Sequence, residues 1–220
     1  MIDPEQVALV LLAAGHSHRF GEVDKLAEPF LDKPLAYHVV TALEAIPFMT
    51  RIAIVSDTVL DFAELGYEVV ENPDPTLGQA RSVCHGVKRA KERGAQAVLI
   101  ALADMPRVTA GHVYRLFDAF VGDDSVVASS DGVQPMPPAL FGKGRFEELL
   151  ALDGDQGARD LIRGGKHVVT SPAELIDIDT QDDLRDLRET FGLKTDHVTP
   201  RFPIDPAGAA GATGASPSGD

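Results

Sequence analysis

The sequence predicts an α/β fold with a mostly parallel central sheet. Two observations support this prediction: short runs that are apolar at nearly every position, and amphipathic segments of helical spacing between them. Uninterrupted apolar runs are typical of strands that are buried on both faces of a parallel sheet. Strands that alternate with helices indicate β-α-β units. The chain has 220 residues, of which 44% are hydrophobic, and this suits one well-packed domain better than two.

The expected strands and helices follow one another along most of the chain. The apolar runs lie at residues 7–13, 51–55, 67–71, 97–102, 125–129, 137–141, 166–170 and 174–178. The apolar faces of helical spacing are formed by Leu35, Val39, Leu43 and Ile46, by Val83, Val87 and Ala90, and by Val113, Leu116, Phe117 and Phe120. We expect Gly94 to end the second helix and the hydroxyl of Thr109 to cap the third.

Apolar periodicity is lost after Gly192. Residues 193–220 are dominated by Pro, Gly, Ala and Ser, and such a segment cannot bury enough apolar surface to offset the entropy of ordering it. We therefore expect one folded domain over residues 1–192 and a disordered tail over residues 193–220.

The charge of the chain argues against some classes of partner. There are 34 acidic and 20 basic residues, and the net charge of −14 disfavours nucleic acid or an anionic membrane as the main partner. A small anionic ligand remains compatible if local cations or a metal ion reverse the field at one site. No apolar run approaches the roughly 20 residues of a membrane span, and residues 1–6 lack the basic region of a signal peptide. The single Cys84 allows no internal disulfide, so we expect a cytoplasmic protein.

A cationic loop follows the first expected strand, where residues 9–26 read LVLLAAGHSHRFGEVDKL. Ligands of open α/β sheets bind at the carboxyl ends of the strands. Gly15 can adopt a positive φ and present backbone N–H groups to an oxyanion, and Ser17 can add a hydroxyl donor. Arg19 offers a planar fork for phosphate oxygens, and Lys25 offers a point charge. The loop matches neither the G-x4-G-K-[ST] nor the G-x-G-x-x-G pattern.

Two other interpretations of this loop stay open. Its two cations can simply balance Glu22, Asp24 and Glu28 in water. His16 and His18 can converge on a metal ion from positions i and i+2, but no Cys or third His lies nearby. Two histidines in a polar loop are more often surface residues.

Carboxylates follow the later strands. Asp104 comes directly after the apolar segment 97–103, so its side chain is expected to face the same crevice as the cationic loop. Asp177 and Asp179 occupy alternate positions of an extended segment, and one of them can share a divalent cation with Asp104. Mg²⁺ prefers a couple of carboxylates together with phosphate oxygens. Asp104 could instead cap the helix that follows, although Thr109 is better placed for that role.

Cations and carboxylates at one edge of the sheet suit phosphoryl chemistry. A triphosphate held by Gly15, Arg19 and Lys25 beside a carboxylate-bound Mg²⁺ can be attacked in line at one phosphorus, while the cations stabilise the charge that builds up. We expect Thr180 to cap the helix that continues through Leu184 and Leu187.

Five segments of the chain, in the order in which they occur, resemble the MobA-like nucleotidyltransferases. They are most similar to the branch that contains molybdenum cofactor cytidylyltransferase. The resemblance spans residues 7–191 and rests on LAAGHSHRFGEVDKL, NPDPTLGQARSVCHGV, LADMP, PPALFGKGRFEELLALDGDQGARDLI and DIDT. It implies a Rossmann-like three-layer nucleotidyltransferase fold. It also implies Mg²⁺-dependent transfer of a nucleoside monophosphate from an NTP, with CTP favoured, to a small phosphorylated acceptor of the molybdopterin type, with release of pyrophosphate.

The resemblance also implies roles for individual residues. Lys25 matches the family lysine that neutralises charge at the reacting phosphate, Asp104 matches the metal-binding aspartate, and Asp179 matches a second acidic position. Gly78 and Ser82 match positions that face the nucleobase, although Ser82 also fits an N-cap or first-turn role. The residues implied to hold the triphosphate are Leu12, Ala13, Ala14, Gly15, Ser17 and Arg19, together with Lys25.

The sequence departs from the family pattern on the acceptor side. Relatives often carry Arg-Gly-His before the Pro of the strand at 137–141, whereas residues 132–137 read GVQPMP here, so a pterin acceptor is not assured. The GDQGAR segment at 154–159 is retained. In it Asp155 fits a helix N-cap, and Arg159 fits either a surface cation or an acceptor-side residue.

Three other functions compete with this one. The first is a non-catalytic nucleotide-binding partner or chaperone of a molybdoenzyme, and the second is a nucleotidyltransferase for a sugar phosphate or another small phosphorylated molecule. The third, a nicotinamide-dependent redox enzyme, is disfavoured because G-x-G-x-x-G is missing. Lys25 and Asp104 favour the enzyme. The expected partners are an NTP, a small anionic acceptor and a molybdoenzyme or its chaperone.

Overall fold

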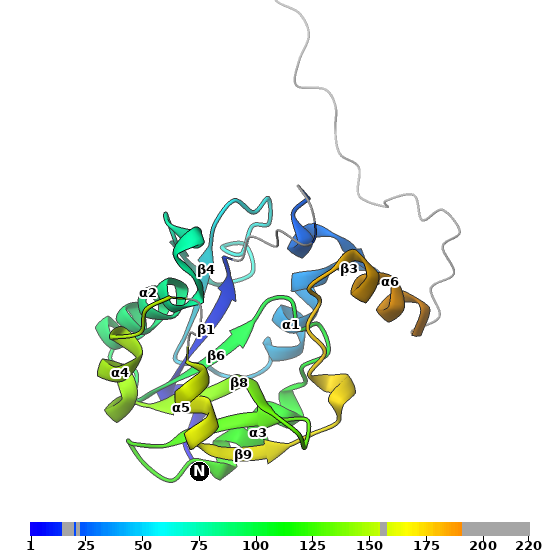
Figure 1. The fold of residues 1–220 in the computed structure, drawn as a ribbon. Helices are drawn as coiled ribbons and strands as arrows, with labels where there is room; N and C mark the ends of the chain where they lie inside the picture. Colours follow the sequence, from blue (N-terminus) through cyan, green and yellow to red (C-terminus); the bar gives the residue numbers. More distant parts are fainter. Residues whose placement is uncertain (15–19, 21–22, 155–157, 191–220) are drawn as a thin grey trace, which may run out of the picture.

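The computed structural model describes residues 1–14, 20, 23–154 and 158–190, and a seven-stranded sheet lies at its centre (Figure 1). The strands lie side by side in the order β5-β4-β1-β6-β8-β7-β9. Their bounds are β1 Val7–Ala13, β4 Thr50–Val55, β5 Glu68–Glu71, β6 Ala97–Leu102, β7 Val126–Ser130, β8 Pro135–Gly142 and β9 Lys166–Val169. Only β8 runs antiparallel to its neighbours, β6 and β7. The predicted α/β fold with a mostly parallel sheet is confirmed.

The expected strand at 174–178 is wrong. Pro172–Glu174 form a 3-10 turn, and the residues after it make no strand. Leu175 and Ile178 are buried in two different apolar clusters instead of lying side by side on the sheet. The segment lies against the loop at the carboxyl end of β6, to which it is joined by a hydrogen bond from Ile178 N to Asp104 O (3.1 Å).

Helices cover both faces of the sheet and complete three layers (Figure 1). Every residue of β1 is buried, and its side chains alternate between the two faces. Leu9 and Leu11 pack in a cluster with α1 (Leu35–Leu43) and α3 (Ala110–Ala119). Val10 and Leu12 pack in a second cluster with α2 (Gln79–Glu92), α4 (Phe146–Leu150) and α5 (Arg159–Gly164). Of these helices, the sequence patterns did not predict α4.

The central helix α2 lies unusually close to β1. A β-carbon at Gly86 would overlap the side chain of Val10, so only glycine permits this approach. The expected helix ends are confirmed: Gly94 follows α2 with φ +85°, and the Thr109 hydroxyl accepts a hydrogen bond from His112 N (3.2 Å) at the start of α3.

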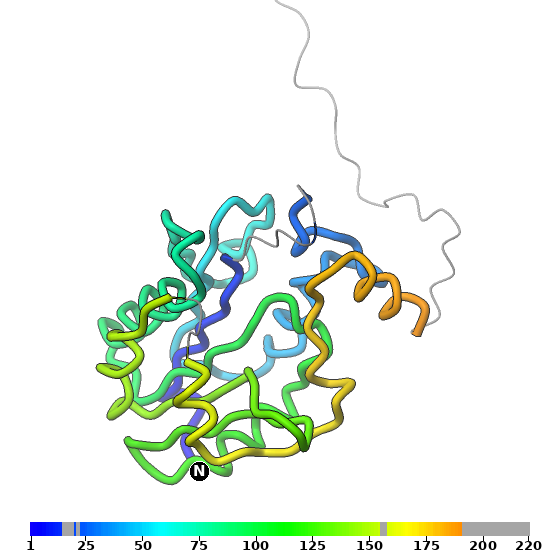
Figure 2. Tube along the Cα trace, viewed as in Figure 1, coloured from blue at the N-terminus to red at the C-terminus, as the bar shows by residue number. Residues whose placement is uncertain are grey.

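The last helix packs away from the sheet. α6 (Gln181–Thr190) contributes Leu184 and Leu187 to a third apolar cluster with Phe20 and Phe30. Phe30 belongs to a short hairpin formed by β2 (Pro29–Phe30) and β3 (Lys33–Pro34). The segment before α6 crosses this hairpin in the view of Figure 2, and its Ile178 packs in the same cluster. None of the described helices is long and apolar enough to cross a membrane.

Candidate active site

Lys25 is held at the carboxyl end of the sheet by the residue before it. It begins η2 (Lys25–Ala27), a 3-10 turn whose N-cap is Asp24. One oxygen of Asp24 accepts a hydrogen bond from Leu26 N (3.0 Å), and the other accepts one from the Thr58 hydroxyl (2.6 Å). Lys25 is only 8% exposed. The interpretation of Lys25 as a solvated cation is therefore wrong, because Asp24 anchors its turn to the segment after β4.

The ammonium of Lys25 points at the carboxylate that follows β6. Its Nζ donates to Oδ2 of Asp104 (2.7 Å) and lies 3.8 Å from Oδ1 of Asp179. The other oxygen of Asp104, Oδ1, is buried and has no hydrogen-bond partner among the described residues. Buried carboxylate oxygens normally have a partner. Asp104 therefore has one oxygen engaged by a cation and a second available to another ligand.

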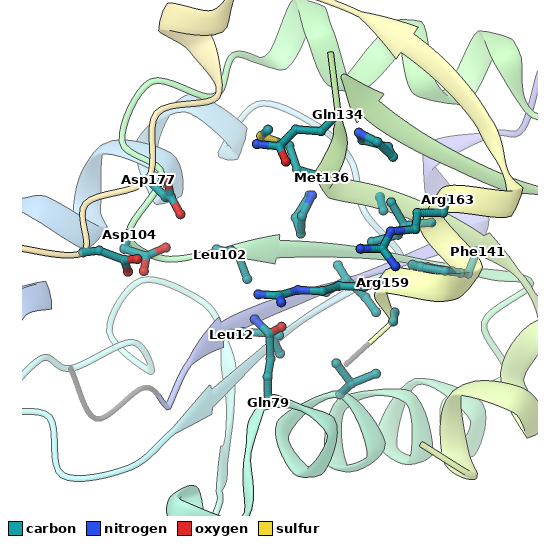
Figure 3. A pocket seen from close by; sticks show the side chains of 18 of the residues that line it. Leu12, Gln79, Leu102, Asp104, Gln134, Met136, Phe141, Arg159, Arg163 and Asp177 are labelled. Atoms are coloured by element: carbon teal, nitrogen blue, oxygen red, sulfur yellow. The ribbon is translucent and has the colours of Figure 1, made fainter. Parts of the chain in front are cut away.

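The 176–179 segment brings further carboxylates to the same place. Asp183 Oδ2 accepts hydrogen bonds from Asp179 N (3.1 Å) and Thr180 N (2.7 Å), while the Thr180 hydroxyl accepts one from Asp183 N (3.1 Å). This reciprocal arrangement is a capping box, and it confirms the expected N-cap Thr180. Loss of hydration and the charge of Asp104 raise the pKa of Asp177. Asp177 and Asp104 line the same cavity (Figure 3).

These carboxylates suit a divalent cation only if a substrate completes its shell. Within residues 1–14, 20, 23–154 and 158–190, no three His, Cys, Asp or Glu side chains form a cluster suited to a metal ion. Asp104 Oδ1 and the carboxylate of Asp179 are hard oxygen donors, and Mg²⁺ is commonly held by one or two such groups together with phosphate oxygens and water. The unpartnered Oδ1 therefore fits a metal–nucleotide complex better than a metal ion alone.

Two cavities meet at Asp104. The smaller, of about 240 Å³, is lined by Leu12, Ala13, Ala14, Lys25, Leu26, Pro75, Gly78, Gln79, Ser82, Leu102 and Asp104. The larger, of about 810 Å³, lies between β8, α5 and the 176–179 segment (Figure 3). Both include Leu12, Gln79, Leu102 and Asp104 in their walls. A molecule in one cavity can thus reach a molecule in the other beside this carboxylate.

The Ser82 hydroxyl accepts a hydrogen bond from Asn72, and this leaves its own proton to donate. The side-chain amide of Asn72 accepts a hydrogen bond from Asp74 N (3.1 Å) and donates one to Ser82 Oγ (3.0 Å). The Ser82 proton is then left to donate elsewhere. The N-cap interpretation of Ser82 is wrong, because the N-cap of α2 is Gly78, whose φ of +92° favours glycine. The first-turn interpretation is confirmed, since Ser82 is the fourth residue of α2.

Seven of the predicted site residues thus surround the smaller cavity: Leu12, Ala13, Ala14, Lys25, Gly78, Ser82 and Asp104. Asp179 lines the larger one. Gly15, His16, Ser17, His18, Arg19 and Asp155 lie outside the described residues.

Sequence patterns missed two supporting residues, Asp24 and Asn72. Asp24 had a readable signal, because an aspartate directly before a turn is a common N-cap. Asn72 lies ten positions before Ser82 in the NPDPTLGQARSVCHGV segment, but no spacing rule predicts that their side chains meet. The Cys84 thiol lies against carbonyl oxygens at the end of α4, and burial raises its pKa.

Two curated proteins are similar to this chain over most of its length. The chain is 31% identical over 193 residues to the purine catabolism protein PucB of Bacillus subtilis, covering 79% of this chain and 92% of that protein. It is 23% identical over 201 residues to a molybdenum cofactor guanylyltransferase of Shewanella pealeana, covering 87% and 98%.

Solved structures show the same fold. A homologue of Mycobacterium tuberculosis rv0371c from Mycobacterium sp. strain JC1 superposes with a TM-score of 0.73 at 24% identity, covering 86% of this chain and 99% of that one. The MobA-like NTP transferase domain family matches residues 9–170. This chain therefore belongs to the MobA-like NTP transferase family and is a nucleotidyltransferase.

Proposed function

We propose that the protein transfers a nucleoside monophosphate from an NTP, CTP in the first place, to a small anionic acceptor with release of pyrophosphate, and that it depends on Mg²⁺. The observation that carries this proposal is the pair formed by Lys25 and Asp104 where the two cavities meet, with one oxygen of Asp104 left unpartnered. A nucleotide in the smaller cavity and an acceptor in the larger would have their reacting groups beside this pair. The single Cys84 and these substrates fit a cytoplasmic enzyme.

The reaction moves one phosphoryl centre between two oxygens. An oxygen of the acceptor forms a bond to the α-phosphorus, the bond from that phosphorus to the oxygen bridging to the β-phosphorus breaks, and pyrophosphate leaves with the electron pair. The ammonium of Lys25 is held in a nearly closed site, where it stabilises the negative charge that grows on the α-phosphate oxygens. Asp104 and Asp179 would hold Mg²⁺, which neutralises phosphate charge when bound. In this proposal Gly15, Ser17 and Arg19 bind the leaving pyrophosphate group.

The walls of the smaller cavity favour cytosine over guanine. Guanine presents N1–H and the N2 amino group as donors, and a carboxylate is their usual partner. The only carboxylate among the described residues of this wall is Asp104, which already binds Lys25. Cytosine presents the acceptors N3 and O2, and the Ser82 hydroxyl can donate to one of them. Guanine also has an acceptor, O6, so the preference rests on the missing partner for its N1–H and N2 donors.

For the acceptor, we propose a molybdopterin-type cofactor, since the family includes molybdenum cofactor guanylyltransferases. A second candidate is another small phosphorylated molecule, such as a sugar phosphate. Residues 133–137, where the Arg-Gly-His pattern is missing, form a wall of the larger cavity (Figure 3). The departure from the family pattern thus falls where it would change which acceptor binds. The protein partner that suits a molybdopterin-type acceptor is a molybdoenzyme or its chaperone.

The test is pyrophosphate release from each of four NTPs, with and without Mg²⁺ and with molybdopterin or a sugar phosphate as acceptor. We expect release with CTP, Mg²⁺ and molybdopterin, and none when Mg²⁺ is removed. NTP binding without release under any of these conditions would favour the non-catalytic alternative. Thermal melts with each NTP report binding independently, because a ligand at 100 times its Kd adds about 2.7 kcal/mol of stability.

A further inference from the structure

Two arginines from one helix line the larger cavity and are absent from the wall of the smaller one. Arg159 and Arg163 belong to α5, and both are part of the cavity wall. Figure 3 shows their guanidinium groups turned into the cavity, with Arg163 toward Phe141 and Asp104 and Asp177 at the opposite end. Ala158 and Ile162 of the same helix region are buried, and this burial fixes the face that α5 presents to the cavity.

The charges around these arginines are not balanced by the protein. Arg159 makes no hydrogen bond or ion pair with another described residue. Arg163 pairs with Asp160 at 3.2 Å, but the side chains are 68% and 78% exposed, and such a surface pair is weak. Like charges at positions i and i+4 of a helix destabilise it. In a chain of net charge −14, two cations facing one cavity indicate a place for an anion.

No acidic side chain lies beside the two arginines in the described wall of this end of the cavity. Ile100, Met136, Ala139 and Phe141 line it together with Gln134, and the described carboxylates of the wall, Asp104, Asp177 and Asp179, lie at the other end (Figure 3). An anion at the arginine end would therefore meet no repelling charge from the described wall of that end. The carboxylates at the other end repel that anion, so the ligand has a defined orientation.

We propose that Arg159 and Arg163 bind a phosphate or carboxylate group of the acceptor that is separate from the group that attacks the nucleotide. This inference rests on the proposed function and adds to it the class of acceptor: an organic molecule with an anionic group remote from its reacting oxygen. The planar forks of the two arginines suit either anion, and Arg159 and Arg163 then determine acceptor specificity.

The experiment measures binding of three probes to the full chain by isothermal titration calorimetry. The probes are phenyl phosphate, benzoate and the uncharged benzyl alcohol, and the variants are Arg159→Gln and Arg163→Gln. Arg185→Gln is the matched control, because Arg185 forms an exposed i,i+3 pair with Asp182 as Arg163 does with Asp160, and it lies outside both cavity walls.

We expect at least one anionic probe to bind, benzyl alcohol to bind much more weakly, and each cavity variant to weaken the anion by roughly tenfold to a hundredfold. Added salt should weaken binding as well. Which anion binds identifies the group as a phosphate or a carboxylate. Binding of neither anion, or equal loss in Arg185→Gln, would overturn the inference.

Nucleotide binding keeps the two proposals apart. Thermal stabilisation by CTP and Mg²⁺ should be the same in Arg159→Gln, Arg163→Gln and the unmodified chain. If CTP and the other NTPs stabilise none of them while the anions still bind through the arginines, the proposed function fails and the anion site stands. If NTPs bind and the anionic probes bind Arg159→Gln and Arg163→Gln as tightly as the unmodified chain, only the inference about the anion site fails.

Discussion

Replacing Lys25 by Met tests the proposed chemistry most directly, because it removes the ammonium and keeps most of the side-chain volume. Removing one preorganised group that stabilises transition-state charge typically costs about 2.7–4 kcal/mol. We therefore expect kcat to fall by about 10²–10³-fold. Lys25→Arg should not restore the full rate, since a planar guanidinium cannot occupy the position of an ammonium 2.7 Å from Asp104.

The same change should lower stability by a smaller amount. Breaking a fully buried ion pair costs about 3–5 kcal/mol. The Asp104 side chain is 20% exposed and opens onto both cavities, so water can solvate it and we expect about 1–2 kcal/mol. For a chain of this size that is a fall in Tm of about 2–8 °C.

Two measurements check this prediction. Steady-state pyrophosphate release gives kcat and KM, and thermal melts give Tm. The control is Lys33→Met, because the Lys33 ammonium bonds the exposed Thr41 hydroxyl and lines neither cavity. A Lys25→Met variant with kcat within about threefold of the unmodified chain would refute the assigned role.

Asp104→Asn should abolish turnover and weaken Mg²⁺-dependent NTP binding with the fold intact, and near-normal activity would mean that the carboxylate is structural. Asp24→Ala should cost about 1–2 kcal/mol of stability, because a cap is lost, and should lower kcat more than it raises KM; unchanged kinetics would exclude a positioning role. Burial and the charge of Arg115 lower the pKa of His112 below 6.5, so the unfolded chain binds its proton more readily and stability should fall as pH drops below about 6.5. Denaturant melts between pH 5 and 8 should show this fall reduced in His112→Asn. The composition of residues 193–220 predicts that a chain ending at Gly192 has the same Tm as the full chain, and a clear loss would show that these residues dock on the domain.

Most strands could be predicted from the sequence because the signal is local. The runs at 7–13 and 97–102 are buried on both faces, and their apolar residues mark the strand bounds without help from other segments. The direction of β8 could not be predicted, because an apolar run carries no information about which way it crosses the sheet. The run at 174–178 misled for a related reason: its apolar side chains serve two clusters that only the tertiary fold defines.

At the site, too, features with a local sequence signal could be predicted, and features that depend on the tertiary fold could not. The positions of Asp104 and Lys25 at the carboxyl edge of the sheet could be predicted, because Asp104 follows an apolar run and Lys25 lies in the cationic loop after the first strand. Their pairing, 79 positions apart, was not predictable from spacing, since it depends on β1 and β6 being neighbours in the sheet. The donor role of the Ser82 hydroxyl likewise depends on its hydrogen bond from Asn72, ten positions away, which no local pattern predicts.

Asp104 is the only carboxylate among the described residues that lines both cavities, and this has a consequence for how such an enzyme diversifies. The smaller cavity is built mainly from the ends of β1 and β6, the turn that begins at Lys25 and the start of α2, whereas most of the walls unique to the larger one come from residues 133–137, the rest of β8, α5 and the 176–179 segment. If the acceptor binds in the larger cavity as proposed, mutations in residues 133–137 or in α5 can change the acceptor while the nucleotide, the metal and the reacting phosphorus keep their places. In that case, the residues that carry the reaction and most of the residues that recognise the acceptor lie in different parts of the fold, so acceptor specificity can change without substitutions at Lys25 or Asp104.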